Sequence, residues 1–220
     1  MTTILIATRN AHKVGEIRAI LGDGFNFLTL ADFVGSPNVV EDANTFEGNA
    51  RKKAEDIARW LGQTEEAMRN MQVQYILADD SGLEVDALDG APGVNSARYA
   101  ALDAGTPGNS SDADNNAKLL RVLADVPGPR RSARFRCVIA LSEATKGGSA
   151  LETHIFQGAC EGRIGFELQG RDGFGYDPLF YPQGSEKSFA ILPRAIKNEI
   201  SHRGQALGRL KQFFKQRARQ

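Results

Sequence analysis

The first thirty residues alternate between two kinds of hydrophobic pattern, and this alternation constrains the fold more than any other feature of the chain. Thr2–Thr8 is a short β-branched apolar run, which is typical of a buried strand. Apolar residues at helical spacing follow it, and Gly22 predicts the end of that helix. Residues 25–30 then alternate like a second strand. Strand, helix and strand in this order predict the beginning of an α/β fold.

The rest of the chain continues the mixture of helices and strands. Thr45 has the position of a helix N-cap, and a polar piece separates that helix from a strand that begins at Tyr75. The segment 105–118 is rich in turn formers and predicts a loop. We expect helices over 46–62, 115–125 and 204–220, and further strands over 131–144 and 149–165.

Length predicts a single domain, and net charge gives no indication of a polyanionic partner. The chain has 220 residues, and 27 basic residues balance 27 acidic ones, so net charge does not favour nucleic acid. A nucleic-acid tail over the last twenty residues, with their six Lys/Arg, is the alternative to a solvated helix end.

Cysteine usage and hydropathy predict the compartment. Cys137 and Cys160 lack metal-ligand spacing, so we expect free thiols and a reducing cytoplasm. The first ten residues turn polar too soon for a signal peptide, and no apolar run approaches the roughly 20 residues of a membrane span. We therefore expect no membrane partner.

Two adjacent carboxylates follow the apolar run 76–78. Asp79 and Asp80 precede Ser81 and a glycine, and we expect the strand to end there. Neighbouring like charges cost free energy unless a positive charge compensates them. Mg²⁺ prefers oxygen ligands and needs only one or two carboxylates beside substrate phosphates. The alternative is a pair of turn-forming aspartates.

Two polar segments carry groups suited to phosphate. Thr8–Lys13 joins a strand to a helix, where free backbone N–H groups and the positive helix end favour an anion. Glu41–Ala54 contains Lys53 about two turns inside the next helix. Ordinary capping and a solvated charge run are the alternatives for these two segments.

Two later segments carry groups suited to a flat ligand. Gly170–Pro182 has three glycines within six residues beside Phe174 and Tyr176, so backbone and ring could approach a base, or the segment is a tight turn. His202 and Arg203 offer donors before the last helix, where Ser201 could simply be its N-cap.

Taken in order, these segments resemble the inosine triphosphate pyrophosphatase family, also called Ham1-like. The blocks that carry the resemblance are "TRNAHK", "TFEGNARKKA", "DDSGLEVDALDGAPGVNSARYA", "GFGYDP" and "SHRGQAL", which span residues 8–207. The resemblance implies an α/β fold in which an elongated, mixed, twisted β-sheet with flanking helices forms two lobes around a central cleft. It implies one domain over residues 1–220.

The resemblance also implies an activity. Family members hydrolyse ITP, dITP and XTP, which arise by deamination of ordinary purines, to the monophosphate and pyrophosphate. They need Mg²⁺ and are usually homodimers, so the implied partners are a nucleoside triphosphate and a second copy of the chain.

Roles for individual residues follow from the same resemblance. Asp80 matches the general base and Mg²⁺ ligand, Glu41 the second ligand, and Asp79 a supporting neighbour. The residues that match contacts to the triphosphate are Thr8, Arg9, Asn10, Ala11, His12, Lys13, Lys53 and Ser81. The residues that match contacts to the nucleobase are Phe174, Gly175, Tyr176, Asp177, Lys197, His202 and Arg203.

Two departures from the family pattern stand out. Arg9 occupies a position where many relatives have glycine, so we expect no positive φ there. The segment from Gly62 to Gln74 is longer than in many relatives, and we expect a helix extension or a surface loop. Two other functions stay open at this point, a pyrophosphatase for modified pyrimidine or methylated nucleotides and a non-catalytic nucleotide-binding module.

Overall fold

The computed structural model describes residues 1–63, 72–144 and 152–219. Most of the predicted extension between Gly62 and Gln74, and the first residues of the predicted strand 149–165, lie outside these ranges. The elements are β1 (Thr2–Ile6), α1 (Ala11–Leu21), β2 (Phe25–Thr29), η1 (Leu30–Asp32), α2 (Phe46–Gln63), β3 (Tyr75–Val85), η2 (Asp86–Leu88), η3 (Gly93–Arg98), α4 (Ala101–Ala104), α5 (Asp112–Val122), η4 (Gly128–Arg130), β4 (Ser132–Glu143), β5 (Thr153–Ile164), β6 (Phe180–Pro182), α6 (Arg194–Ile200) and α7 (His202–Arg217).

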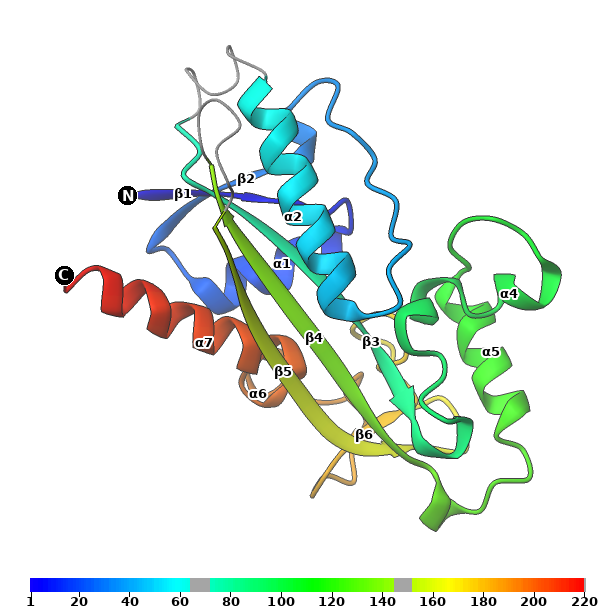
Figure 1. The fold of residues 1–220 in the computed structure, drawn as a ribbon. Helices are drawn as coiled ribbons and strands as arrows, with labels where there is room; N and C mark the ends of the chain where they lie inside the picture. The colour runs from blue at the N-terminus through cyan, green and yellow to red at the C-terminus, as the bar shows by residue number, and fades with distance from the viewer. Residues whose placement is uncertain (64–71, 145–151, 220) are drawn as a thin grey trace. The chain divides into compact units, whose positions relative to one another are not determined.

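The strands form one mixed sheet of six strands in the order β2-β1-β3-β4-β5-β6 (Figure 1). β1 pairs in parallel with β2 and β3, with Ile4 opposite Phe27 and Tyr75, whereas β5 and β6 are antiparallel. The predicted α/β class with a mixed sheet and flanking helices is therefore confirmed.

The chain divides into two compact units, and β3, β4 and β5 each contribute residues to both. The first unit comprises residues 1–80, 137–157 and 203–220, and the second comprises 81–136 and 158–202.

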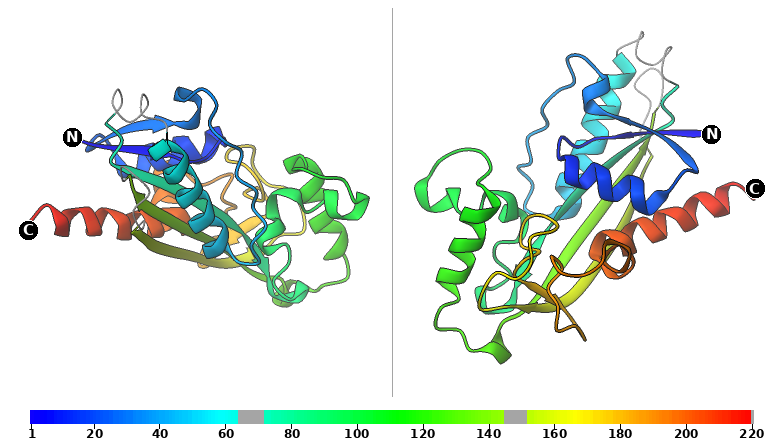
Figure 2. Two further views of the ribbon diagram at one scale, coloured as in Figure 1. Left: turned by 45° about the horizontal axis from the view of Figure 1, so that its top comes forward. Right: turned by 180° about the vertical axis from the view of Figure 1, so that it is seen from behind.

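The sheet of the first unit is covered on both faces. α2 lies against one face, and α1 and α7 lie against the other (Figures 1 and 2). Alternate strand residues such as Ile4, Ile6 and Leu77 pack with Ile17 of α1 and Leu207 of α7. Because successive side chains of a strand point to opposite faces, the intervening positions of β3 face α2.

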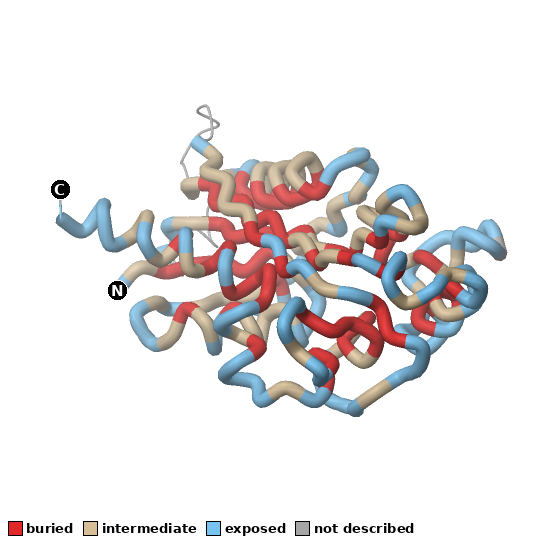
Figure 3. Tube along the Cα trace, turned by 90° about the horizontal axis from the view of Figure 1, so that it is seen from below, coloured by how far each residue is buried: buried red, intermediate tan, exposed pale blue. Residues whose placement is uncertain are grey.

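The second unit has a core of its own. Leu83 and Val85 of β3 pack with Leu119 of α5 and with the aromatic residues Phe180 and Phe189. Buried residues of this kind follow the strands and the inner sides of the helices (Figure 3).

Several boundaries differ from the sequence-based expectation. α7 begins at His202 rather than Gly204, so His202 and Arg203 lie in its first turn and not before it. β3 does not end at the paired carboxylates but continues through them to Val85, where lysine and arginine side chains contact the two carboxylates. α5 begins at Asp112 rather than Asn115, because the Ser111 side chain accepts a hydrogen bond from the Asp114 amide at 3.1 Å and caps the helix there. No helix within the described ranges combines the length and apolar character needed to cross a membrane.

Candidate active site

The two adjacent carboxylates on β3 belong to different surroundings. Asp79 has the same parity as Leu77 and contacts residues of α1 and α7, whereas Asp80 contacts Lys53 of α2. The strand alternation therefore directs the two carboxylates to opposite faces of the sheet, although the charge of Lys13 acts on both of them.

Asp79 lies in a buried cluster of cations. Its carboxylate contacts Lys13 Nζ at 2.7 Å and Arg203 Nε at 2.9 Å, and the Cys137 thiol lies 3.2 Å from Oδ2. Arg203 also contacts Glu16 at 2.5 Å. Burial opposes the ionisation of Asp79, but Arg203 and Lys13 outweigh it and hold the pKa of that carboxyl well below its usual range. Asp79 is therefore a structural anion that fixes both cations.

The Asp80 carboxylate contacts fewer positively charged groups than the Asp79 carboxylate. Lys53 Nζ lies 3.3 Å from Asp80 Oδ1 and 3.2 Å from Glu41 Oε2, and it donates to the Asp79 carbonyl at 2.8 Å. The second carboxylate oxygen of Asp80 is buried, and no hydrogen-bond donor of the described residues contacts it. Burial, with the nearby charges of Glu41 and Asp79 and against those of Lys53 and Lys13, raises the pKa of Asp80 to about 6.

α2 positions Lys53 and also the loop that carries Glu41. Lys53 lies on the buried side of the helix with Ala50 and Ala54. Asn49, one turn earlier, accepts a hydrogen bond from the Ala43 amide at 2.9 Å and so ties that loop to the helix. The predicted N-cap Thr45 is confirmed, since its hydroxyl accepts from the Gly48 amide at 3.0 Å.

The carboxylates of Asp80 and Glu41 suit a hard divalent cation. Both contact the same ammonium group, and one buried oxygen of Asp80 has no donor within the part of the chain that the structure describes. Such an oxygen is a natural ligand for Mg²⁺, which completes its shell with water and phosphate. Glu143, Glu152 and His154 form another group of possible metal ligands, but Arg217 contacts Glu143 at 2.5 Å and already supplies positive charge there.

In the loop between β1 and α1, side chains of the loop itself accept hydrogen bonds from several backbone N–H groups. Asn10 caps α1 by accepting from the amides of His12 and Lys13 at 2.9 and 3.1 Å, so these two N–H groups are not free as the sequence suggested. Thr8 accepts from the Asn10 amide at 3.2 Å. Residues 9–12 are exposed. Anion contacts at this helix end therefore depend on side chains, on Ala11 and on the helix dipole.

Arg9 does not require the backbone of a glycine. Among described non-glycine residues a positive φ occurs at Gln72 and Asp89, so the expectation for Arg9 is confirmed. Its guanidinium donates to the carbonyl and hydroxyl of Ser36 at 2.9 and 3.1 Å.

The second unit gathers the residues matched to the nucleobase around Asp177. This carboxylate accepts from the Phe174 amide at 2.9 Å and from Lys197 Nζ at 2.6 Å. Gly173 has a φ of +82°, and a Cβ there would lie 2.1 Å from the Asp177 carboxylate, so glycine is required. Lys197 lies 5.4 Å from the centroid of the Phe174 ring.

An aromatic row continues from this group to His202. Lys197 lies 5.7 Å from the centroid of Phe189, and Phe189 stacks on Phe135 at 6.0 Å. Phe135 then stacks on His202, with ring centroids 4.8 Å apart and an interplanar angle of 12°. Both His202 and Lys197 are buried.

Three residues that were predicted to contact the substrate are buried or half-buried. Tyr176 is buried in the core of the second unit, and its hydroxyl donates to the Ser96 carbonyl at 2.9 Å. Ser81 is half-buried on β3, directly after Asp80. The Arg203 guanidinium contacts Asp79 and Glu16 within the first unit, and its predicted contact with the nucleobase stays a prediction.

Several residues that shape these groups were not predicted. Each of four further residues contacts a predicted site residue or the loop that carries one; they are Glu16, Asn49, Phe135 and Cys137. Only Asn49 carried a signal, since a polar residue between apolar helix positions often has a buried partner.

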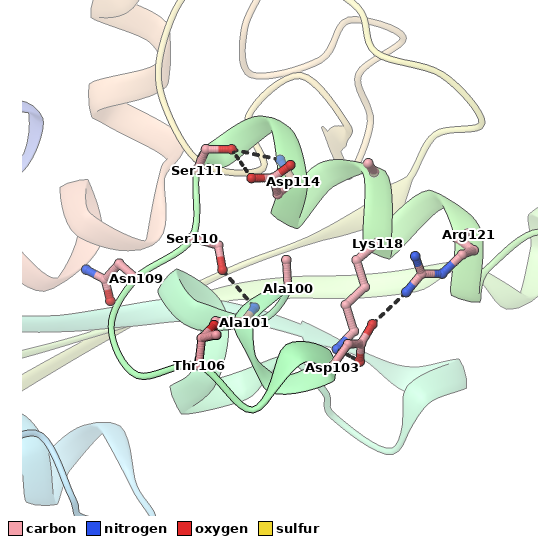
Figure 4. A pocket seen from close by; sticks show the side chains of 11 residues that line it. Ala100, Ala101, Asp103, Thr106, Asn109, Ser110, Ser111, Asp114, Lys118 and Arg121 are labelled. Atoms are coloured by element: carbon pink, nitrogen blue, oxygen red, sulfur yellow. Dashed lines mark hydrogen bonds and ion pairs between the residues drawn. The ribbon is translucent and has the colours of Figure 1, made fainter.

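The second unit also contains a polar pocket of about 530 Å³ between α4 and α5 (Figure 4). Its charged side chains pair with one another. Asp103 contacts Lys118 and Arg121, each at 2.6 Å, and Asp114 accepts from Ser111 at 2.6 Å. These pairings leave no charge imbalance that indicates a ligand.

Comparison with known proteins shows the family of the chain. The Ham1 family model matches residues 4–213. The dITP/XTP pyrophosphatase of Exiguobacterium sibiricum is 47% identical over 208 residues, covering 94% of each chain, and that of Geobacter sulfurreducens is 47% identical over 212 residues, covering 96% of each. The Ham1 protein of Staphylococcus aureus has a TM-score of 0.78 at 35% identity, covering 98% of this chain and 100% of that one. A HAM1 protein from Coxiella burnetii has a TM-score of 0.79 at 37% identity with the same coverage. The chain belongs to the Ham1 family.

Proposed function

We propose that the protein hydrolyses deaminated purine nucleoside triphosphates, namely dITP, ITP and XTP, to the monophosphate and pyrophosphate. The activity named for its relatives supports this proposal. The observation that carries it is the Asp80 carboxylate, which is buried beside Lys53 and Glu41, has a pKa of about 6, and has one oxygen that no donor among the described residues contacts. A carboxylate with a raised pKa is suited to accept a proton near neutral pH.

Asp80 acts as the general base in this proposal. A water oxygen forms a bond to the α-phosphorus while the bond from the α-phosphorus to the bridging oxygen breaks. The proton of the water moves to Asp80, and pyrophosphate leaves with the electron pair. Positioning and electrostatic stabilisation dominate such phosphoryl chemistry, so the protein needs few covalent contacts.

Asp80 and Glu41 would hold Mg²⁺, which when bound neutralises triphosphate charge and makes a water ligand more acidic. Lys53 keeps the two carboxylates together by contacting both. Lys13 and Lys53 contact the departing phosphates in this proposal. An ammonium group has three donors, and the contact of Lys13 with Asp79 uses one of them.

Phe174 stacks on the purine ring, and His202, Arg203 or nearby backbone N–H groups donate to its 6-oxo group. An adenine presents an amino group there, which leaves a buried donor without an acceptor and is therefore rejected. The support for this assignment is the arrangement of Phe174 and Lys197 around Asp177.

We further propose a homodimer in the cytoplasm. Exposed apolar side chains of the second unit, among them Phe166, Leu168 and Ile196, support a protein contact. The two free, buried thiols support a reducing compartment. Light scattering on the purified protein would measure the mass, and a monomeric mass would contradict the dimer.

The test of the activity is a substrate panel. Pyrophosphate release from dITP, XTP, dGTP and dATP is measured with Mg²⁺ and with excess EDTA. We expect turnover of dITP and XTP that EDTA abolishes, and far slower turnover of dATP. Equal rates for all four nucleotides would contradict the selectivity, and full turnover in EDTA would contradict the metal.

A further inference from the structure

The helix α5 holds both polar groups of a single residue in the nucleobase loop. The Gly175 amide donates to Asp112 at 2.7 Å, and the Gly175 carbonyl accepts from the Asn116 side-chain amide at 2.9 Å. Asp112 and Asn116 are four positions apart, so they share one face of the helix. Together they bind both the N–H group and the carbonyl group of Gly175.

The identity of Asn116 is hard to explain by packing alone. It is 4% exposed and lies on the helix beside Leu119, which is fully buried. Its side-chain oxygen is also buried, and no donor of the described residues contacts it. An apolar residue would avoid the cost of that unpaired acceptor. The hydrogen bond that Asn116 donates to the Gly175 carbonyl therefore accounts for an amide at this position.

Gly175 sits where the loop must turn. Its φ is +62°, and a Cβ at this residue would meet no atom within 4 Å, so conformation rather than space calls for glycine. Without the hydrogen bonds to Asp112 and Asn116, the glycine would leave the backbone of this turn free to adopt other conformations. The bonds to α5 remove that freedom directly after Phe174, whose own amide is held by Asp177.

We propose that Asp112 and Asn116 are positioning residues that hold Phe174 in place for the purine ring. This inference rests on the proposed function, because it assigns Phe174 to the nucleobase. Neither residue touches the phosphates or the reacting atoms in this proposal. Their loss weakens nucleotide binding and leaves the chemical step nearly unchanged, since an interaction made equally in the ground state and transition state changes KM alone.

The matched control lies in the same turn of the same helix. Asp114, like Asp112, is an acid in the first turn of α5, but its side chain points to Ser111 (Figure 4). D114A therefore reports the loss of an acid at the helix end without any change at Gly175. D112N keeps an oxygen that accepts from the Gly175 amide, whereas D112A does not. N116D places an oxygen against the Gly175 carbonyl, so it should be worse than N116A.

The measurement is steady-state hydrolysis of dITP, with thermal unfolding of every variant. For D112A and N116A we expect KM to rise about tenfold, the factor for one or two lost hydrogen bonds, with kcat within about threefold of wild type. D112N and D114A should keep the wild-type KM, and N116D should have the highest KM of the set.

The outcomes separate the inference from the proposed function. If D112A and N116A match D114A in KM, the positioning role is wrong. It is also wrong if kcat and the melting temperature fall while KM stays constant, because that is the behaviour of a purely structural contact. If wild-type protein releases no pyrophosphate from dITP, the proposed function itself fails, whatever the variants do.

Discussion

Asp79 and Asp80 are adjacent on β3, yet their carboxylates contact helices on opposite faces of the sheet. Asp79 binds Lys13 at 2.7 Å and Arg203 at 2.9 Å. Asp80 shares Lys53 with Glu41, and one of its oxygens has no donor in residues 1–63, 72–144 and 152–219. One aspartate is therefore committed to structure, and the other remains available for chemistry. Substitution of Asp80 should therefore lower activity directly, whereas substitution of Asp79 should lower stability and, through Lys13 and Arg203, also disturb contacts that we assign to the substrate.

For Asp80→Asn we expect dITP turnover to fall by about 10²–10⁴-fold, the usual contribution of a general base. The carboxamide keeps the shape of the side chain but removes the proton acceptor and one charge. Pyrophosphate release under saturating dITP is the measurement. Turnover near that of wild type would remove Asp80 from the mechanism.

The same variant should change how stability depends on pH. Burial raises the pKa of Asp80 to about 6, above the value of about 3.9 for an unfolded chain. A raised pKa contributes stability that is present below the unfolded value and is lost as pH rises through the folded one. In EDTA, the free energy of unfolding of Asp80→Asn relative to wild type should therefore increase from pH 4 to pH 7. A constant difference over that range would contradict the raised pKa.

Asp79→Asn should destabilise the protein by about 3–5 kcal/mol, because it leaves the buried Arg203 and the half-buried Lys13 without their counter-charge. Urea unfolding of both proteins is the measurement. The pKa of Asp79 is lowered, so its contribution is present above the unfolded value of about 3.9 and is lost as pH falls through the folded one. The difference from wild type should thus be constant above pH 5 and shrink below pH 4; a difference that grows in acid would argue against the ion pairs.

Gly173→Ala should be more disruptive than Gly184→Ala, although both glycines have positive φ values of +82° and +79°. At Gly184 nothing lies within 4 Å of an added Cβ, so we expect only the conformational cost of about 1–2 kcal/mol. At Gly173 the Cβ would meet the Asp177 carboxylate at 2.1 Å and displace it from Phe174 and Lys197. Equal melting temperatures and equal KM values for dITP would show that this close approach is unimportant.

The two thiols should be unreactive in the folded protein. Burial, reinforced by Asp79, raises the pKa of Cys137 well above its usual range, and burial raises the pKa of Cys160 to about 11. Because the thiolate is the reactive form, a disulfide reagent at pH 8 should modify neither residue within minutes. In urea both should react, which serves as the positive control, and rapid modification without urea would contradict their burial.

Local sequence was sufficient for the class of the fold and for several of its boundaries. β-branched runs and helical spacing predicted β1, α1 and β2, and Thr45 marked the start of α2. These features depend on neighbours within a few residues, so they can be predicted from the sequence. The ordered motifs also identified the family, which the match over residues 4–213 confirmed.

The partners of each motif were decided only by the tertiary structure. Arg203 reaches Asp79 across 124 positions, and Asn116 reaches Gly175 across 59, separations at which no periodic pattern carries information. The sequence placed Asp79 and Asp80 at the end of a strand, whereas β3 continues through them, where lysine and arginine side chains contact the two carboxylates. Strand alternation directs the two carboxylates to opposite faces, but only the helices on those faces determine which of them is held by two cations and which keeps an oxygen without a donor among the described residues.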